Sequence, residues 1–234
     1  MSNDVSNPAT GEGGRTPQIG DRELCDRYGD VPTAAINDVL RAHGLLHQVL
    51  PPAVTPLNPT SRTAGIAFTI KGSKNLVLDD EMEERAAMLE AITSNSVCVW
   101  DTSADDESAQ WGEVMTLAAM RQGARGAVVD GGVRDTEKLL ELGFPVFCRY
   151  RTSNGMLGRF RMSAWQTPVR IGSVTIEPGD VIVGDLDGVI VVPRDRAAEV
   201  LLAAEAVKEQ ENDIKSLIHD GLTPREVVER GGYF

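Results

Sequence analysis

The stretch GAVVDGGVRD, residues 126–135, is the part of the chain that decides the fold. Residues 126–130 form a short apolar run that predicts a buried strand, and a helical pattern begins at Asp135. Between the two, Gly131 and Gly132 permit positive φ and close approach of the backbone, as at many sites in α/β proteins. The stretch therefore predicts a strand, a glycine turn and a helix, with Arg134 and Asp135 at the mouth of the helix.

Arg134 and Asp135 form a pair with two interpretations. A carboxylate such as Asp135 can bind a hard divalent cation through oxygen, and a guanidinium such as Arg134 can hold a carboxylate or an enolate through two hydrogen bonds. In the structural alternative, Asp135 caps the helix and Arg134 forms a surface ion pair. Taken alone, the pair favours this alternative, because helix caps of this kind are common.

The segment 111–121 favours the ligand-binding interpretation of Arg134 and Asp135 over the structural one. Its apolar residues recur at the spacing of one helix face, and they are Trp111, Val114, Met115, Ala118 and Ala119. Glu113 follows Gly112 at the start of this helix, and 20 residues separate it from Arg134. That length suffices for a helix, a turn and a strand, so both segments are expected at the strand ends where α/β proteins bind ligands. Glu113 alone is also explained as an acidic residue that favours a helix N-terminus.

The same helix N-terminus predicts an anion site. The N–H groups of Glu113, Val114 and Met115 would be free there, and free N–H groups together with the helix dipole bind anions. With Arg134 and two carboxylates nearby, the residues predict a site for an anionic ligand and a cation.

Composition narrows the class of protein. The 234 residues carry a net charge of −12, which disfavours binding to nucleic acid and to anionic membranes. No apolar run approaches the roughly 20 residues of a membrane helix, and the first 20 residues lack the apolar stretch of a signal peptide. Three widely spaced cysteines, Cys25, Cys98 and Cys148, predict reduced core thiols in a cytoplasmic protein.

Charge is unevenly distributed along the chain. Residues 79–107 hold ten acidic side chains against a single basic one, Arg85. Residues 111–170, which contain the predicted site, hold nine basic against five acidic side chains, a net charge of +4. The overall acidity therefore does not argue against an anionic substrate.

The chain is predicted to be one mixed α/β domain over residues 21–234, with a disordered tail at 1–20 and a helical arm at the C-terminus. Expected helices are 21–28, 32–43, 84–93, 111–121, 135–142, 195–219 and one that begins at Thr223 and Pro224. Expected strands are 62–71, 96–101, 126–130, 144–150, 169–176, 180–183 and 189–192, and residues 50–59 are expected to form a loop.

The arrangement Glu113-X20-Arg134-Asp135 resembles the acidic-X20-Arg-Asp signature of the RraA-like / 4-hydroxy-4-methyl-2-oxoglutarate aldolase family. Further segments resemble the family in the same order: AAINDVL at 34–40, TAGIAFT at 63–69, DGGVRD at 130–135, GFPVF at 143–147, PGD at 178–180, GDLDGV at 184–189 and VVP at 191–193. The resemblance implies an α/β/β/α sandwich of the RraA-like, swivelling-domain-like type. It also implies homotrimers or hexamers with active sites between subunits.

Catalytic members of this family are class II, metal-dependent lyases. They cleave 4-hydroxy-2-oxo diacids to pyruvate, or decarboxylate oxaloacetate, through a pyruvate enolate. The resemblance implies the following roles: Asp135 binds Mg²⁺, Mn²⁺ or another divalent cation; Arg134 and Glu113 are catalytic; and Gly112, Glu113, Val114, Met115 and Arg134 bind the substrate.

One feature departs from the family pattern: Lys138 occupies a position that is often acidic in these aldolases. The family's aldolases also use a carboxylate from a neighbouring subunit. Glu209 and Glu211 are candidates for it, although a solvated helix face is favoured as the explanation of either residue. Arg149, Arg151, Arg159 and Arg161 either line a pocket for a distal carboxylate or belong to a surface loop. Two alternatives stay open: a non-enzymatic regulator that binds a ribonuclease, and a sugar-acid lyase on the same scaffold.

Overall fold

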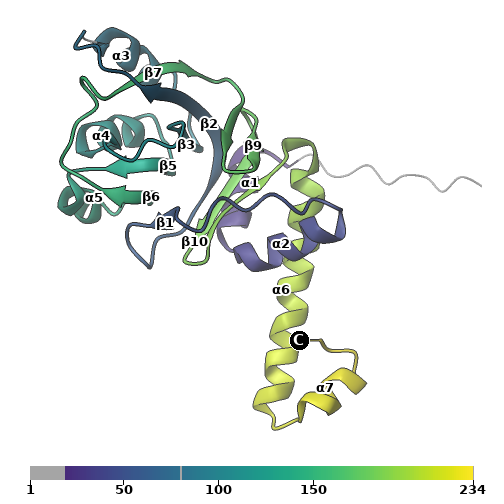
Figure 1. The fold of residues 1–234 in the computed structure, drawn as a ribbon. Helices are drawn as coiled ribbons and strands as arrows, with labels where there is room; N and C mark the ends of the chain where they lie inside the picture. Colours follow the sequence, from purple (N-terminus) through teal and green to yellow (C-terminus); the bar gives the residue numbers. More distant parts are fainter. Residues whose placement is uncertain (1–18, 80, 234) are drawn as a thin grey trace, which may run out of the picture.

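The structure is a computed structural model that describes residues 19–79 and 81–233 (Figure 1). The predicted tail lies almost wholly outside this range. The helices are α1 (Asp21–Gly29), α2 (Thr33–Ala42), α3 (Met82–Glu90), α4 (Glu113–Arg121), α5 (Thr136–Leu142), α6 (Ala197–His219) and α7 (Pro224–Glu229), with a 3₁₀ turn at Arg194–Arg196. The strands are β1 (Thr55–Pro56), β2 (Thr63–Lys74), β3 (Ser96–Asp101), β4 (Ala109–Trp111), β5 (Gly126–Val133), β6 (Val146–Arg151), β7 (Phe160–Trp165), β8 (Val169–Ile171), β9 (Val174–Ile176), β10 (Val181–Asp185) and β11 (Gly188–Val192).

One sheet holds most of the strands. Its order is β1-β6-β5-β3-β2-β10-β11, with β4 added to β5 and β7 added to β2. Strands β2, β3, β5 and β6 run parallel to one another, whereas β10 and β11 are antiparallel. Val49 bridges to Ile190 of β11, and Thr55 of β1 pairs with Cys148 of β6. The segment between these contacts links the two ends of the sheet, which is therefore a nearly closed barrel.

Side chains alternate between the inside and the outside of this barrel, as the pleat of a strand requires. In β3, Val97 and Val99 point to an inner core that the β8–β9 hairpin also fills. Cys98 and Trp100 point to an outer core beneath α3, α4 and α5. A second outer core lies between β10–β11 and helices α1, α2 and α6. Helices thus cover strands on both outer sides, and the predicted α/β/β/α sandwich is confirmed.

The strand β5 corrects the expectation for the glycine pair. Gly131 and Gly132 continue the strand, which ends at Val133, and neither has positive φ. Their role is close approach: a Cβ on Gly131 would lie 2.3 Å from Gln110 Oε1, and one on Gly132 would lie 2.5 Å from Ser108 O. The residue that turns the chain is Asp135 itself, with φ of 56°.

Three short or edge strands were not predicted. Trp111 ends β4, so the helix predicted from Trp111 begins two residues later, at Glu113. Val114, assigned to the buried helix face, is 76% exposed. β1 lies inside the predicted loop 50–59, and β7 spans six residues for which no strand was predicted. Strands as short as β1 and β4 leave no readable alternation in the sequence.

Other local expectations are confirmed. Thr223 caps α7 with Pro224 at the first helical position, in a capping box completed by Glu226. The three cysteines are buried and free, and burial raises the pKa of Cys25 to about 11. In the part of the chain that the structure describes, no helix has the length and apolarity to cross a membrane.

Candidate active site

The carboxyl-terminal edge of the parallel strands carries the residues that the sequence singled out. Arg134 and Asp135 follow β5, and Gly112 follows β4, which pairs with the end of β5. The Arg134 N–H donates to Trp111 O at 3.0 Å, which fastens the two segments together. Gly112, Glu113, Arg134 and Asp135 therefore share one edge of the sheet.

Asp135 has a strained backbone. Its φ of 56° and ψ of 35° lie in the left-handed region, which costs a residue other than glycine about 1–3 kcal/mol, although aspartate tolerates it better than most. Its side chain makes no capping hydrogen bond to α5. Asp135 therefore occupies the N-cap position of α5, but its side chain does not cap the helix, contrary to the helix-cap interpretation.

The Asp135 carboxylate faces α4 and Arg134. Its Oδ2 accepts a hydrogen bond from the Glu113 N–H at 3.3 Å and lies 3.6 Å from Arg134 Nε. Within the described ranges, no hydrogen bond or ion pair reaches its Oδ1. Because 41% of the side chain is exposed, this oxygen is available to an external ligand.

Gly112 makes this contact possible. A Cβ at position 112 would lie 2.7 Å from Asp135 Oδ2 and 3.2 Å from the Arg134 side chain. Any larger residue would push both side chains out of place. Gly112 therefore belongs to the site through its lack of a side chain.

The N-terminus of α4 leaves two of the three predicted N–H groups unused. The Glu113 N–H is taken by Asp135. In the part of the chain that the structure describes, the N–H groups of Val114 and Met115 have no acceptor, because the first intrahelical bond runs from Thr116 to Gly112 O. Free N–H groups at the positive end of a helix dipole attract anions, so these two groups leave the predicted anion site beside Asp135 open.

Two adjoining cavities meet at Arg134. The Asp135 cavity, of about 390 Å³, is lined by Gly112, Val114, Met115, Arg134 and Asp135 on one side and by α3 on the other. The Arg161 cavity, of about 410 Å³, is lined by Arg134 and by two further segments: Val77, Leu78, Asp79, Glu81, Met82 and Arg85, and Gly155, Met156, Leu157, Phe160 and Arg161. Met82, Arg85, Arg134 and Met156 line both. The site therefore has space for a small ligand with two ends.

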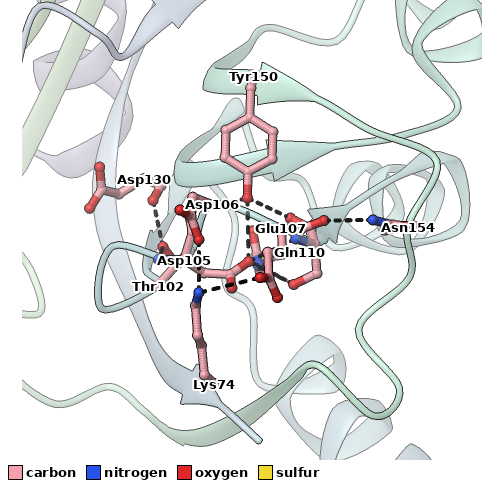
Figure 2. A network of polar contacts seen from close by, with 10 residues as sticks. Lys74, Thr102, Asp105, Asp106, Glu107, Gln110, Asp130, Tyr150 and Asn154 are labelled. Atoms are coloured by element: carbon pink, nitrogen blue, oxygen red, sulfur yellow. Dashed lines mark hydrogen bonds and ion pairs between the residues drawn. The ribbon is translucent and has the colours of Figure 1, made fainter. Parts of the chain in front are cut away.

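A buried polar network supports the site from behind (Figure 2). Gln110 Nε2 donates to Asp105 Oδ2 at 2.7 Å, while its Oε1 accepts from the Gly132 N–H at 3.0 Å. Ser108 donates to the same Asp105 oxygen through N–H and hydroxyl, at 2.9 and 2.7 Å. Tyr150 closes the network by donating to Ser108 O at 3.0 Å.

This network fixes the loop after β3 to the end of β5. Burial raises the pKa of the Asp105 carboxyl, but hydrogen bonds from Ser108 and Gln110 outweigh it and hold the pKa below its ordinary value. Asp105 is therefore ionised and acts as an acceptor. The network was not predicted, and its one signal in the sequence is Gln110, two residues before Gly112.

The remaining predicted residues are dispersed. Arg149 lies 3.7 Å from Asp130, Arg159 is exposed, Arg151 borders a hollow beside Asp135, and Arg161 enters the cavity named after it. The four arginines do not gather in one pocket. Lys138 is exposed and pairs with Glu141, which, with a smaller contribution from Glu113, raises the pKa of its ammonium group. Glu209 and Glu211 lie on α6, in the arm that extends away from the sheet (Figure 1).

Comparison with known proteins agrees with the family resemblance of the sequence. A family model described as RraA-like, Aldolase/RraA, matches residues 33–191. A relative from Halalkalibacterium halodurans with the provisional name 4-hydroxy-4-methyl-2-oxoglutarate aldolase is 34% identical over 82% of this chain and 85% of its own length. Protein DlpA of Legionella pneumophila is 32% identical over 82% of this chain. The match spans only 31% of DlpA.

Solved structures share the fold. A crystal structure described as novel cellulases from microbes of the gut ecosystem has a TM-score of 0.81 and 46% identity, over 86% of this chain and 90% of that one. Streptomyces coelicolor RraAS2, described as an unusual member of the RNase ES inhibitor RraA family, has a TM-score of 0.77 and 27% identity, over 85% of this chain and 99% of its own. The chain therefore belongs to the Aldolase/RraA family.

Proposed function

We propose that the protein is a divalent-metal-dependent lyase that cleaves or decarboxylates a 2-oxo acid through a pyruvate enolate. The observation that carries this proposal is the strained Asp135, whose carboxylate is aimed into a cavity beside Arg134. The provisional aldolase name of the Halalkalibacterium relative supports the same reaction class.

The residues at this edge fit Mg²⁺. Mg²⁺ keeps several waters and takes one or two carboxylates together with ligand oxygens. Asp135 Oδ1 is a carboxylate oxygen of this kind. In the described part of the chain, no group of three or more His, Cys, Asp or Glu side chains could hold a metal, so Asp135 alone would bind the ion directly, and water and substrate oxygens would fill the other positions. Mn²⁺ would be the natural substitute.

The cation, when bound, supplies positive charge to the 2-oxo and carboxylate oxygens of the substrate. Arg134 places its guanidinium against the 2-oxo oxygen, where negative charge develops. The N–H groups of Val114 and Met115 bind the adjacent carboxylate. These contacts would hold the 2-oxo acid end of the substrate.

Retro-aldol cleavage needs a base at the 4-hydroxyl. We assign this role to Glu113, acting through a water. As the 4-hydroxyl gives up its proton, its oxygen becomes the carbonyl of the second product, a 2-oxo acid or aldehyde, and the C3–C4 electron pair enters the enolate. Return of that proton to C3 then gives pyruvate. Decarboxylation of oxaloacetate breaks the bond to CO₂ and forms the same enolate without that base, so one site serves both reactions.

The direct test is pyruvate release from oxaloacetate and from 4-hydroxy-4-methyl-2-oxoglutarate, with Mg²⁺ and with EDTA. Asp135→Ala should lower kcat/KM about 1,000-fold or more, because several kcal/mol of charge stabilisation would be lost. Asp187→Ala removes an exposed aspartate in the β10–β11 turn and serves as the matched control. Turnover that survives EDTA, or full activity in Asp135→Ala, would contradict the proposal.

We propose further that the enzyme works in the cytoplasm as a homotrimer or hexamer. The free, buried cysteines suit a reducing compartment. Large apolar side chains are exposed around the site, among them Leu78, Val114, Leu117 and Leu157, and such patches mark protein interfaces. A neighbouring subunit would bring Glu209 or Glu211 to the site. Light scattering gives the number of chains.

A second candidate is a regulator that binds a ribonuclease. The likeness to RraAS2 favours it. Such a role needs neither a cation nor a 2-oxo acid, so Asp135→Ala should leave ribonuclease inhibition unchanged. Inhibition of a ribonuclease by a chain with no lyase activity would favour this candidate.

A further inference from the structure

Helix α3 turns an apolar face toward the Asp135 cavity, although it lies in the acidic segment 79–107. Met82, Ala86 and Leu89 are spaced four and three residues apart, which places them on one side of the helix, and all three line this cavity. Met88, on another side of the helix, is buried in the outer core. Met88 therefore anchors α3, whereas Ala86 is exposed to the cavity.

The opposite wall of the Asp135 cavity is apolar as well. Val114 and Met115 lie in the first turn of α4, and α4 contacts α3. Trp111 and Met156 complete this wall, and both side chains are buried, as is that of Met115. The cavity therefore lies between two helices and has apolar side chains on both sides.

The polar side chains that line this cavity already have tasks. Gln110 uses both ends of its amide in the buried network, and Arg85 pairs with the buried carboxylate of Glu81. Asp135 and Arg134 belong to the proposed catalytic site. Beyond the 2-oxo acid end, the cavity therefore offers a substrate mainly apolar contacts.

The cavity has room for more than a three-carbon acid. Its volume is about 390 Å³. An apolar cavity of about 150 Å³ is large enough to bind benzene, and pyruvate has as many non-hydrogen atoms as benzene. A 2-oxo acid held at Asp135 and Arg134 would therefore leave space for a group as large as a phenyl ring. Small-molecule sites commonly combine a few polar groups, which fix orientation, with mostly apolar walls.

We propose that the walls between α3 and α4 bind an apolar alkyl or aryl substituent at C4 of the substrate, and that Ala86 and Leu89 set this preference. This inference rests on the proposed function, because Asp135 and Arg134 must hold the 2-oxo acid end of the same molecule. Ala86 acts through its small size, which keeps the cavity open, and Leu89 acts through contact with the substituent.

With an aryl substituent, the reaction is the cleavage of 4-hydroxy-2-oxo-4-phenylbutanoate. The 4-hydroxyl gives up its proton as the C3–C4 bond breaks, and C4 leaves with its oxygen as the carbonyl of benzaldehyde. The C3–C4 electron pair enters the enolate, and return of the proton to C3 gives pyruvate. The released aldehyde carries no charge, which suits the apolar walls.

The test compares the binding of two acids that differ only at C4 and lack the 4-hydroxyl needed for cleavage. 2-Oxo-4-phenylbutanoate carries a phenyl group where 2-oxobutanoate carries a hydrogen. Kd is measured by titration calorimetry with Mg²⁺ for the wild type, Ala86→Phe and Leu89→Ala. Ala87→Phe places the same ring at the next exposed position of α3, outside the cavity lining, and is the matched control. Pyruvate release from 4-hydroxy-2-oxo-4-phenylbutanoate and from oxaloacetate is measured in parallel.

The wild type should bind the phenyl acid about 10- to 100-fold more tightly than 2-oxobutanoate, the range expected when part of an aromatic ring is buried. Ala86→Phe should bring the two Kd values together, because its ring fills the space for the substituent. Leu89→Ala should reduce the ratio of the two Kd values about 3- to 10-fold, because apolar contact is lost. Ala87→Phe should match the wild type.

Equal affinity of the wild type for both acids, binding of neither acid, or an unchanged ratio of Kd values in Ala86→Phe would overturn the proposal. A lower affinity of Ala86→Phe for both acids alike would also overturn it, as this indicates a disturbed catalytic site and not a filled subsite. Binding of the phenyl acid that depends on Ala86 and Leu89, without pyruvate release from either substrate, would contradict the lyase and leave the apolar subsite standing.

Discussion

At the scale of single residues, the site depends on backbone features as much as on charged groups. Asp135 and Arg134 could be predicted from their sequence spacing relative to Glu113. The left-handed conformation of Asp135 could not, because aspartate adopts it only where surrounding structure imposes it.

Gly112 gives a prediction at this scale. Gly112→Ala should lower kcat/KM about 10- to 100-fold, because its Cβ would displace Asp135 and Arg134 and small misplacements of catalytic groups are costly. Tm should change little, because the displaced atoms end flexible side chains. Gly29→Ala, where a Cβ meets nothing within 4 Å, is the control. Wild-type kcat/KM in Gly112→Ala would refute the close-packing role of this glycine.

At the scale of elements, long periodic segments were predictable and short pairings were not. The boundaries of β3 match the prediction, whereas β4, with three residues, was absorbed into the helix that follows it. The glycine pair was assigned to a turn because the sequence does not show Gln110 and Ser108 packed against it. Tertiary contacts, not local propensity, extended β5 by three residues.

The end of β5 carries a pH-dependent group. Burial raises the pKa of Asp130 from 3.8 to about 6, partly offset by Arg149. The folded state therefore binds a proton more tightly than the unfolded state. As the pH rises from 4 to 6, this group should lower the free energy of unfolding of the wild type by up to about 3 kcal/mol. Asp130→Asn should gain stability relative to the wild type over that interval. Urea unfolding at several pH values measures the difference, and a difference independent of pH would rule out this assignment.

At the scale of the whole molecule, the fold and the site support each other. The parallel strands bring the segments that follow β3, β4 and β5 to one edge of the sheet. Helices α3 and α4, which lie outside the nearly closed sheet, form walls of the Asp135 cavity (Figure 1). The order of motifs predicted this architecture, because a family's fold follows from many segments in sequence. The cavity and the buried network behind it arise from contacts between distant segments. Sequence patterns therefore could not predict them.

The central claim is that Asp135 and Arg134 stabilise a pyruvate enolate with a divalent cation. The most direct measurement is exchange of the pyruvate methyl protons in D₂O by proton NMR, since exchange breaks a C3–H bond, forms the enolate and adds a deuteron. Exchange by the wild type should require Mg²⁺ and stop with EDTA, and Asp135→Ala should reduce it to the uncatalysed rate. Exchange that persists in Asp135→Ala or with EDTA would contradict the claim.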